Sequence, residues 1–391
     1  MRRLSAQVIL TNAGPPLKRG VITTDDDGTI IKVENTNGSL RESQSVEFHN
    51  GIIVPGFANC HCHLELSHLK GAVPEGTGLG EFLIQLQNIR NSNPEDVLSS
   101  AVSADKEMYS EGIELCADIC NTSATFSVKR SSRIRYLNML EVFGTDPGKA
   151  DIRMNEIISL SEDSAKSGLD FFIVPHTVYT VSLPLFGLIR KKTGENRITS
   201  IHFMETGGED SFVSDHSGPL KETFEKAGML PRELQTPENL VSAILDEVTP
   251  SGTLILVHNT YADRETVREI LKRKNTFWCL CPDANLYIEN RIPPADMLIS
   301  EGCEIVTGTD SLASNGKLSI LSGLKTLQRY YPSLELEELI RWATINGARA
   351  LGEDRNYGKI IPGKKPGLLL LQNADLVNFR LLPETTVTRL L

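Results

Sequence analysis

Eight short apolar runs, separated by longer amphipathic stretches, recur through the middle of the 391-residue sequence. They end near Asn59, Ile119, Phe143, Val174, Ile201, Val257, Leu280 and Thr309. Strand-like runs that alternate with helix-length stretches are typical of βα units around a parallel sheet. Eight such units in succession favour an α/β fold of the closed (β/α)8 TIM-barrel type over an open doubly wound sheet. No Gly-x-Gly-x-x-Gly motif follows a strand at a helix start, which weakens a dinucleotide-binding interpretation.

The two ends of the chain have a different pattern. Residues 1–55 contain short strand-like runs broken by turn signals, the strongest of which is Asp25-Asp26-Asp27-Gly28. Near the other end, Gly363-Lys364-Lys365-Pro366-Gly367 opens the apolar run from Leu368 to Leu371. We therefore expect a small β-sandwich domain built from both termini, residues 1–55 plus 356–391, beside a TIM-barrel domain of residues 56–355. The N-terminal strands are expected to pair antiparallel.

Charge and composition argue against several classes of function. The net charge is -10 and no basic block or stripe occurs, which argues against nucleic-acid binding and against an anionic membrane surface as partner. No run approaches the ~20 apolar residues of a membrane span, and the start does not resemble a signal peptide. The seven cysteines have no zinc-knuckle spacing. We expect reduced thiols and a cytoplasmic protein that acts on a small molecule.

Polar side chains with metal-ligand chemistry follow the ends of several predicted strands. His61 and His63 come after the first strand, His202 and Glu205 after the fifth, His258 ends the sixth, and Asp310 follows the eighth. Residues two apart on a strand point to the same side, so His61 and His63 should converge. Because the active site of such a barrel lies at the carboxyl ends of its strands, the other residues should join them there. Three imidazoles and a carboxylate suit one divalent cation; zinc is the first expectation, and iron(II) or manganese would also fit.

These residues resemble the motifs of a known family. Asn59-Cys60-His61-Cys62-His63-Leu64-Glu65 resembles the Asn-x-His-x-His-x-Glu signature of the amidohydrolase superfamily, and the segments Gly308–Ser311 and Gly363–Gly367 match it as well. The stretch from Val174 to Ser182 resembles the Pro-His-x-x-Tyr-x-Val-Ser segment of its deaminase branch, which includes aminodeoxyfutalosine, adenosine-type and guanine-type deaminases. The resemblance implies a single metal bound by His61, His63, His202 and Asp310. A single metal is implied because the fourth strand lacks the lysine that bridges two metals in binuclear members.

The resemblance also implies roles for the remaining residues. Asp310 would accept a proton from the attacking water, Glu205 would protonate a ring nitrogen of the substrate, and His258 would stabilise the tetrahedral intermediate. The candidate substrate-binding residues are His176, Glu141 and Asn285. The alternative for His176 is a simple turn, and the alternative for Glu141 is a structural ion pair. Glu65 is expected to orient the metal ligands, to bind substrate or to cap a helix.

The function expected from this site is metal-dependent hydrolytic deamination. The enzyme would convert the C–NH2 group of a purine-like heterocycle or nucleoside to C=O and release ammonia. One alternative is an amidohydrolase that opens a cyclic amide or removes a formimino group, as in imidazolonepropionase-like and formiminoglutamate-deiminase-like members; an arginine clamp, for which Arg291 is the candidate, would favour it. Another alternative is an inactive barrel scaffold. A homodimer is expected, since homo-oligomers are common among such enzymes.

Overall fold

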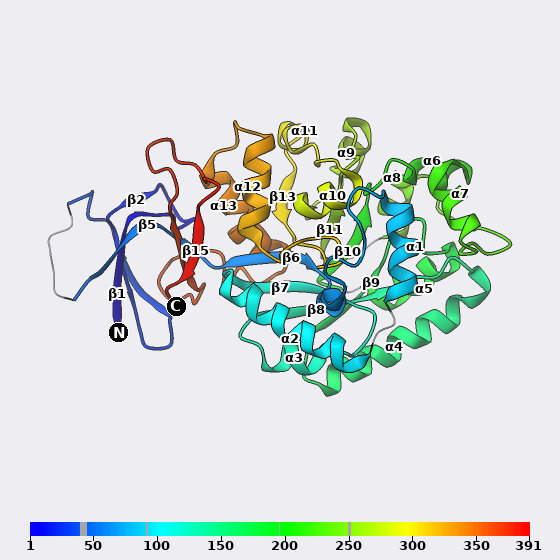
Figure 1. Cartoon of the computed structure of the whole chain (residues 1–391), viewed down its shortest axis with the longest axis horizontal. Coiled ribbons are helices and arrows are strands. Elements are labelled where there is room, and N and C mark those ends of the chain that lie inside the picture. Colours follow the sequence, from blue (N-terminus) through cyan, green and yellow to red (C-terminus); the bar gives the residue numbers. More distant parts are fainter. Residues whose placement is uncertain (40–44, 91–92, 195, 249–251) are drawn as a thin grey trace.

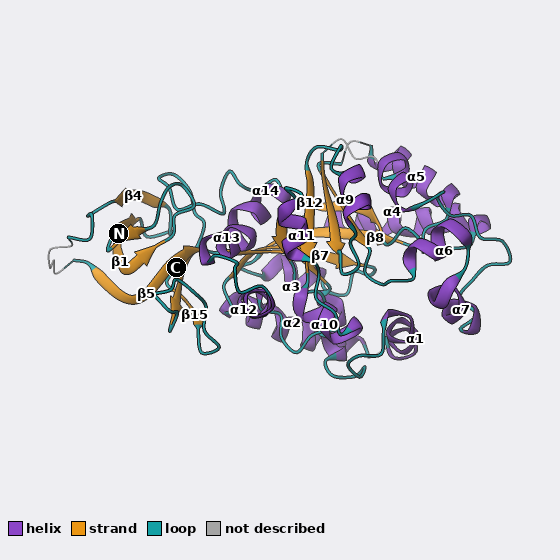
Figure 2. Ribbon diagram, turned by 90° about the horizontal axis from the view of Figure 1, so that it is seen from above, coloured by secondary structure: helices purple, strands orange, loops and turns teal. Residues whose placement is uncertain are grey.

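Three β-sheets organise the computed structural model, which describes residues 1–39, 45–90, 93–194, 196–248 and 252–391. One sheet combines strands from both ends of the chain and lies at one end of the elongated molecule (Figure 1). The other two sheets lie in the central part, with helices packed around their strands (Figure 2).

The two central sheets each contain four parallel strands. In chain order the strands are β6 (Phe57–Cys62), β7 (Ile113–Cys120), β8 (Arg135–Val142), β9 (Phe171–Pro175), β10 (Ile198–Phe203), β11 (Thr253–His258), β12 (Thr276–Leu280) and β13 (Glu304–Thr307). Each coincides with one of the eight predicted runs, so the predicted α/β pattern is confirmed. Nearly every residue of these strands is buried, which explains why the runs are apolar throughout instead of alternating with polar residues.

The two parallel sheets meet at the carboxyl ends of their outer strands. One isolated bridge pairs Cys62 with Asp310, and another pairs Thr177 with His202. The carbonyl oxygen of His61 accepts hydrogen bonds from the backbone N–H groups of Thr309 and Asp310, at 3.0 and 3.1 Å. The end of β6 and the segment after β13 are therefore neighbours in space, although they lie far apart in the sequence.

Both parallel sheets also contribute side chains to one shared core. It includes at least one residue from each of the eight strands: Ala58, Leu115, Met139, Val174, Ile198, Ile255, Phe277 and Val306. The alternation of side chains along a strand then orients the residues that follow. Glu141 lies on the same face of β8 as Met139, and His202 lies on the same face of β10 as Ile198.

Helices connect successive parallel strands as far as β13, and three more follow β13. They are α1 (Leu79–Ile89), α2 (Pro94–Ser110), α3 (Phe126–Ser131), α4 (Ala150–Lys166), α5 (Leu183–Thr193), α6 (Glu209–Asp215), α7 (Gly218–Lys226), α8 (Leu240–Ser242), α9 (Arg264–Ile270), α10 (Pro282–Glu289), α11 (Ala295–Ser300), α12 (Ile320–Tyr330), α13 (Leu336–Arg341) and α14 (Gly347–Ala350). Local sequence signals explain where several begin. The side chain of Asn93 accepts a hydrogen bond from the N–H of Glu95 and precedes Pro94, the first residue of α2. Within the described ranges, no helix is long and apolar enough to cross a membrane.

The sheet at the end of the molecule contains β1 (Arg2–Ile9), β2 (Leu17–Lys18), β3 (Val21–Thr24), β4 (Ile30–Glu34), β5 (Glu47–Pro55), β14 (Leu368–Gln372) and β15 (Thr386–Arg389). The union of both termini in one sheet agrees with the prediction, and the strands are hydrogen-bonded as one seven-stranded sheet. The N-terminal runs predicted as an antiparallel unit do pair antiparallel, β1 with β3 and β3 with β4, whereas β5 pairs parallel to β1. This direction lets the carboxyl end of β5, at Pro55, run straight into β6 and the first candidate metal ligand.

Candidate metal and catalytic site

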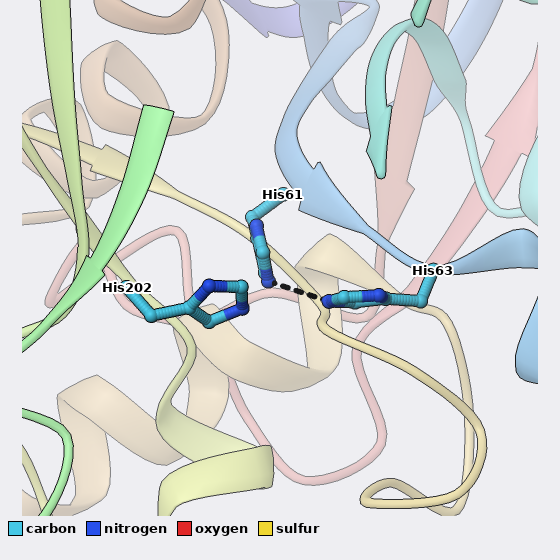
Figure 3. Close-up of side chains that lie close together, drawn as sticks. All are labelled: His61, His63 and His202. Atoms are coloured by element: carbon cyan, nitrogen blue, oxygen red, sulfur yellow. Dashed lines mark hydrogen bonds between the residues drawn. The ribbon is translucent and has the colours of Figure 1, made fainter. Parts of the chain in front are cut away.

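Three imidazoles converge where β6 and β10 end. His61 lies in β6, His63 follows directly after it, and His202 lies in β10. The Nε2 atoms of His61 and His63 are 3.1 Å apart. Potential ligand atoms of all three side chains lie within 4.8 Å of one another, and Figure 3 shows the rings turned toward a common point. The structure therefore brings together three of the four residues that the sequence proposes as metal ligands.

The fourth candidate, Asp310, completes this cluster. Its Oδ1 atom lies 3.6 Å from Nε2 of His61 and 3.5 Å from Nε2 of His63. Its Oδ2 atom accepts a hydrogen bond from the hydroxyl of Ser314 at 2.6 Å, so one carboxylate oxygen is held and the other faces the histidines. Asp310 has a φ of 58°, in the left-handed region that non-glycine residues rarely adopt, and such strain is common at functional sites.

Close packing beneath the cluster requires a glycine. A Cβ atom on Gly308 would lie 2.8 Å from Cβ of His61 and 3.0 Å from the thiol sulfurs of Cys279 and Cys281. Any side chain at this position would push the segment after β13 away from β6. Glycine therefore lets Asp310 approach His61.

Burial sets the protonation of the imidazoles. It lowers the pKa of His61 and of His202 to about 3, and the pKa of His63 well below its usual value. Neutral imidazole has a free lone pair for a metal. In His202 the Nδ1 atom is occupied by a hydrogen bond with the carbonyl oxygen of His176 at 3.0 Å, which leaves Nε2 as the ligand atom. Three neutral imidazoles and one carboxylate within this spacing fit a divalent cation such as zinc.

Glu205 and His258 form a second pair beside this cluster. Oε1 of Glu205 lies 3.4 Å from Nε2 of His258. Burial first, and then the carboxylates of Asp310 and Glu209, raise the pKa of Glu205 well above its usual value, which favours the protonated acid. Asn285, predicted to contact the substrate, is fully buried behind His258 instead. Its Nδ2 atom lies 3.1 Å from Nδ1 of His258. Asn285 would therefore affect the reaction only through the imidazole of His258.

Glu209 was not among the predicted site residues, yet it holds the segment that carries Glu205. Its buried carboxylate accepts hydrogen bonds from the backbone N–H groups of Met204, Glu205 and Thr206, at 2.9, 2.6 and 3.1 Å. Met204 has a φ of 50°, so the turn that these bonds stabilise includes a left-handed residue. Burial raises the pKa of Glu209 to about 7 although the three N–H groups lower it.

Glu141 and His176 lie on the other side of His202. Oε2 of Glu141 accepts a hydrogen bond from Nδ2 of Asn121 at 3.1 Å, and Oε1 lies 3.6 Å from Nδ1 of His202. His176 is fixed through its Nδ1 atom, 2.8 Å from the hydroxyl of Thr180. Burial lowers the pKa of His176 to about 4 and raises that of Glu141, although His202 and Asn121 lower the latter.

A cavity of about 510 Å³ gathers most of these groups. Its polar lining includes His63, His202, His258, Glu205 and Asp310, together with Glu141 and His176. A different part of its lining is apolar and comes largely from α1, through Leu79, Phe82, Leu83 and Leu86. This size and mixture are typical of sites for small organic molecules. Glu65 and Asn285 are not among the residues that line it.

The sequence matches the model of the Amidohydrolase family over residues 52–387. The chain belongs to the amidohydrolase family. The match spans all eight parallel strands and every candidate ligand. The prediction of a hydrolase that acts on non-peptide carbon–nitrogen bonds is thereby confirmed.

Relatives within the amidohydrolase family include several deaminases. The chain is 26% identical over 371 residues to a 5-methylthioadenosine/S-adenosylhomocysteine deaminase from Pyrococcus abyssi, covering 89% of this chain and 80% of that protein. It is 25% identical over 331 residues to an adenosine deaminase from Helicobacter pylori, covering 82% and 79%.

Solved structures agree with the fold. The aminofutalosine deaminase of Helicobacter pylori, in complex with methylthio-coformycin, superposes with a TM-score of 0.80 at 20% identity, covering 96% of this chain and 93% of that one. An adenosine deaminase from Xanthomonas campestris with bound zinc gives a TM-score of 0.70 at 21% identity, covering 96% and 85%.

Arg291, the candidate carboxylate clamp of the alternative amidohydrolase activities, does not line the cavity. Its Nε atom donates a hydrogen bond to the carbonyl oxygen of Thr260 at 3.2 Å, and its guanidinium lies 4.4 Å from the centre of the Tyr261 ring. Arg291 is therefore not placed as a carboxylate clamp in this cavity, whereas Arg90 and Arg153 do line it.

Proposed function

We propose that this amidohydrolase is a metal-dependent aminohydrolase that converts the C–NH2 group of an adenine-like heterocycle, free or as a nucleoside, to C=O with release of ammonia. One observation carries the proposal: the cluster of His61, His63, His202 and Asp310 lies beside the buried pair of Glu205 and His258 at one cavity. An inactive scaffold would not need to keep all six residues together. The names of the relatives point to the same reaction.

His61, His63, His202 and Asp310 are the proposed ligands of one divalent metal, with zinc as the first candidate and iron(II) or manganese as alternatives. When bound, the metal supplies an activated water at neutral pH. Asp310 would accept a proton at Oδ1, while Ser314 holds Oδ2 in place. The carboxylate is thus the general base of the proposed reaction.

Glu205 is the proposed general acid. Its raised pKa keeps a proton available, and transfer of that proton to a ring nitrogen makes the neighbouring carbon more electrophilic. His258, held by Asn285, donates through Nε2 toward the oxygen that develops negative charge. Release of ammonia then leaves the C=O product. His176 and Glu141 line the cavity on the far side of His202 and are the proposed substrate-binding residues.

We also propose the domain organisation, the location and the oligomeric state. The two parallel sheets, linked by bridges and a shared core, together form the proposed (β/α)8 barrel of residues 56–355. Residues 1–55 and 356–391, whose strands are hydrogen-bonded as one sheet, are proposed as a second, smaller domain. All seven cysteines are free thiols, which supports a cytoplasmic location. A homodimer is proposed as well, because closed homo-oligomers are common among soluble enzymes.

Ammonia release by the zinc-loaded protein tests the proposal. The substrates should include adenine, adenosine, 5'-deoxyadenosine, 5'-methylthioadenosine and guanine, with an imidazolone and a formimino compound as the comparison set. Turnover of at least one adenine compound is expected. Turnover confined to the comparison set would overturn the proposal, and the Asp310→Asn variant provides the inactive control.

A further inference from the structure

The turn that carries Glu205 has an unusual backbone conformation. The strand β10 ends at Phe203, and Met204, the next residue, has a φ of 50°. Residues other than glycine rarely adopt this left-handed region, so the turn persists only if surrounding groups stabilise it. The direction in which the Glu205 side chain leaves the backbone depends on this turn.

The N–H groups of the turn share one partner, the carboxylate of Glu209. Those of Met204, Glu205 and Thr206 donate to it at 2.9, 2.6 and 3.1 Å. Glu209 is only 1% exposed, so water does not compete for these bonds. Hydrogen bonds to a carboxylate are also stronger than those between neutral groups. One buried side chain therefore binds the residue before the proposed acid, the acid itself and the residue after it.

The carbonyl side of the same turn has a different partner. The N–H of Tyr261 donates to the carbonyl oxygen of Met204 at 2.8 Å. Tyr261 lies three residues after His258, the last residue of β11. This bond ties the turn to the segment of His258 and leaves the N–H groups of the turn to Glu209.

Glu209 itself lies away from the reacting atoms. It is not among the described residues that line the cavity of about 510 Å³. It is the first residue of α6, yet the three N–H groups bound by its carboxylate belong to residues that precede the helix. Capping of α6 therefore does not account for these bonds. Any effect of Glu209 on the reaction would pass through the turn that carries Glu205.

We propose that Glu209 is a positioning residue of the reaction, which binds the backbone of residues 204–206 so that the carboxyl group of Glu205 meets the substrate atom that takes its proton. This inference rests on the proposed deaminase function and adds a residue that acts only through the acid. Proton transfer requires the donor within about 2.6–3.2 Å of the acceptor. A misplacement of about 1 Å can lower a rate about 100-fold. A left-handed turn that lost a partner of its N–H groups would allow such a displacement.

The test is a double-mutant cycle on kcat with the zinc-loaded protein and its fastest substrate among adenine, adenosine and 5'-methylthioadenosine. Glu209→Gln keeps one acceptor oxygen but places an amide donor against one of the three N–H groups. In the wild-type background it should lower kcat by about 10- to 100-fold and change KM by less than about 3-fold. In a Glu205→Gln background it should lower kcat by less than about 3-fold, because the acid that Glu209 positions is already gone. Zinc content should be the same in all four proteins.

Two further variants complete the test. Asp210→Asn is the matched control, because it removes a carboxylate from the next position, where the side chain is exposed and accepts a hydrogen bond from Ser214. Its kcat should stay within about 2-fold of the wild type. Glu209→Asp guards against a Glu209→Gln variant that does not fold. It keeps the charge, but its shorter side chain does not reach all three N–H groups, so it should lower kcat in the wild-type background and not in Glu205→Gln.

The possible results separate positioning from a purely structural role. An equal loss of kcat in both backgrounds would overturn the inference, and so would an unchanged kcat in both Glu209 variants. A loss of zinc in proportion to the loss of kcat would overturn it as well, because Glu209 would then act on His202 and not on Glu205. No turnover of any of the three compounds by the wild type would instead overturn the deaminase proposal, and the inference with it.

Discussion

Replacement of Lys129 by methionine should destabilise this protein far more than an ordinary loss of surface charge. Lys129 and Asp118 form an ion pair in which both side chains are 0% exposed. Nζ of Lys129 also donates to Oδ1 of Asn138 at 2.8 Å and contacts the sulfur of Cys120 at 2.9 Å. Burial alone would lower the pKa of Lys129, but Asp118 and Cys120 raise it above its ordinary value, so the amine is charged. Lys129→Met leaves the charge of Asp118 buried without a cation.

The expected magnitude follows from that stranded charge. Removal of one partner of a buried pair costs about 3–5 kcal/mol, a large share of the ~5–15 kcal/mol by which domains are stable. Lys221→Met is the matched control, because Lys221 pairs with Glu225 at 2.9 Å on the surface of α7, where the two side chains are 28% and 62% exposed. That pair should contribute no more than about 0.5 kcal/mol.

Urea unfolding followed by circular dichroism measures both variants. The free energy of unfolding of Lys129→Met should fall by about 3–5 kcal/mol, with an unchanged dependence on urea. Adding Asp118→Leu should restore part of the loss, since no lone charge remains. Restoration should be incomplete, because Oδ1 of Asp118 also accepts the N–H of Leu64, next to His63, at 2.7 Å. If Lys129→Met cost no more than Lys221→Met, the reasoning from a stranded charge would be refuted.

Three further outcomes are expected. Glu205→Gln should lower kcat by about 100- to 10,000-fold with metal content unchanged, because an acid is lost and not a ligand; a matching loss of metal by elemental analysis would contradict this. Because the pKa of Glu209 is raised from 4.5 to about 7, the folded state keeps a proton that the unfolded state has lost, so stability should fall from pH ~4.5 to ~7 by up to about 3 kcal/mol. Glu209→Gln should flatten that slope in urea titrations across pH, whereas Asp210→Asn should keep it. Gly308→Ala should cost about 1–3 kcal/mol and weaken metal binding in a chelator competition, since its Cβ would lie 2.8 Å from Cβ of His61; unchanged metal affinity would count against the packing argument.

The parts of the molecule that the sequence predicted well share one property: the signal is local. Each parallel strand is buried on both faces and is therefore a continuous apolar run, which explains why all eight strands were found where they were expected. The convergence of His61 and His63 follows from strand alternation, and His202 and Asp310 each lie at or just beyond a strand end. The roles of these residues as ligands remain predictions.

The parts that the sequence missed depend on contacts between segments that only the fold brings together. Two examples are the ion pair of Lys129 with Asp118 and the hydrogen bond of Asn121 with Glu141. Each joins two segments, and neither segment's own sequence determines how the two align. The parallel pairing of β5 with β1 is a further example, since the turn signals alone suggest hairpins. Glu209 does carry a local signal. It lies four residues after Glu205 and follows two glycines, a pattern compatible with a capping role.

The strand β5 lies between β1 and β14, so one of its two hydrogen-bonding edges stays open until the last part of the chain has been made. At about 5–20 residues per second, a ribosome needs on the order of 15–60 seconds to translate the ~310 residues that separate β5 from β14. During that interval a nascent chain carries an unprotected apolar edge, which is a template for wrong pairing. Cells that make this enzyme rapidly should therefore depend on chaperones that shield the N-terminal strands, and a premature stop before Leu368 should yield aggregates even though every candidate catalytic residue has been synthesised.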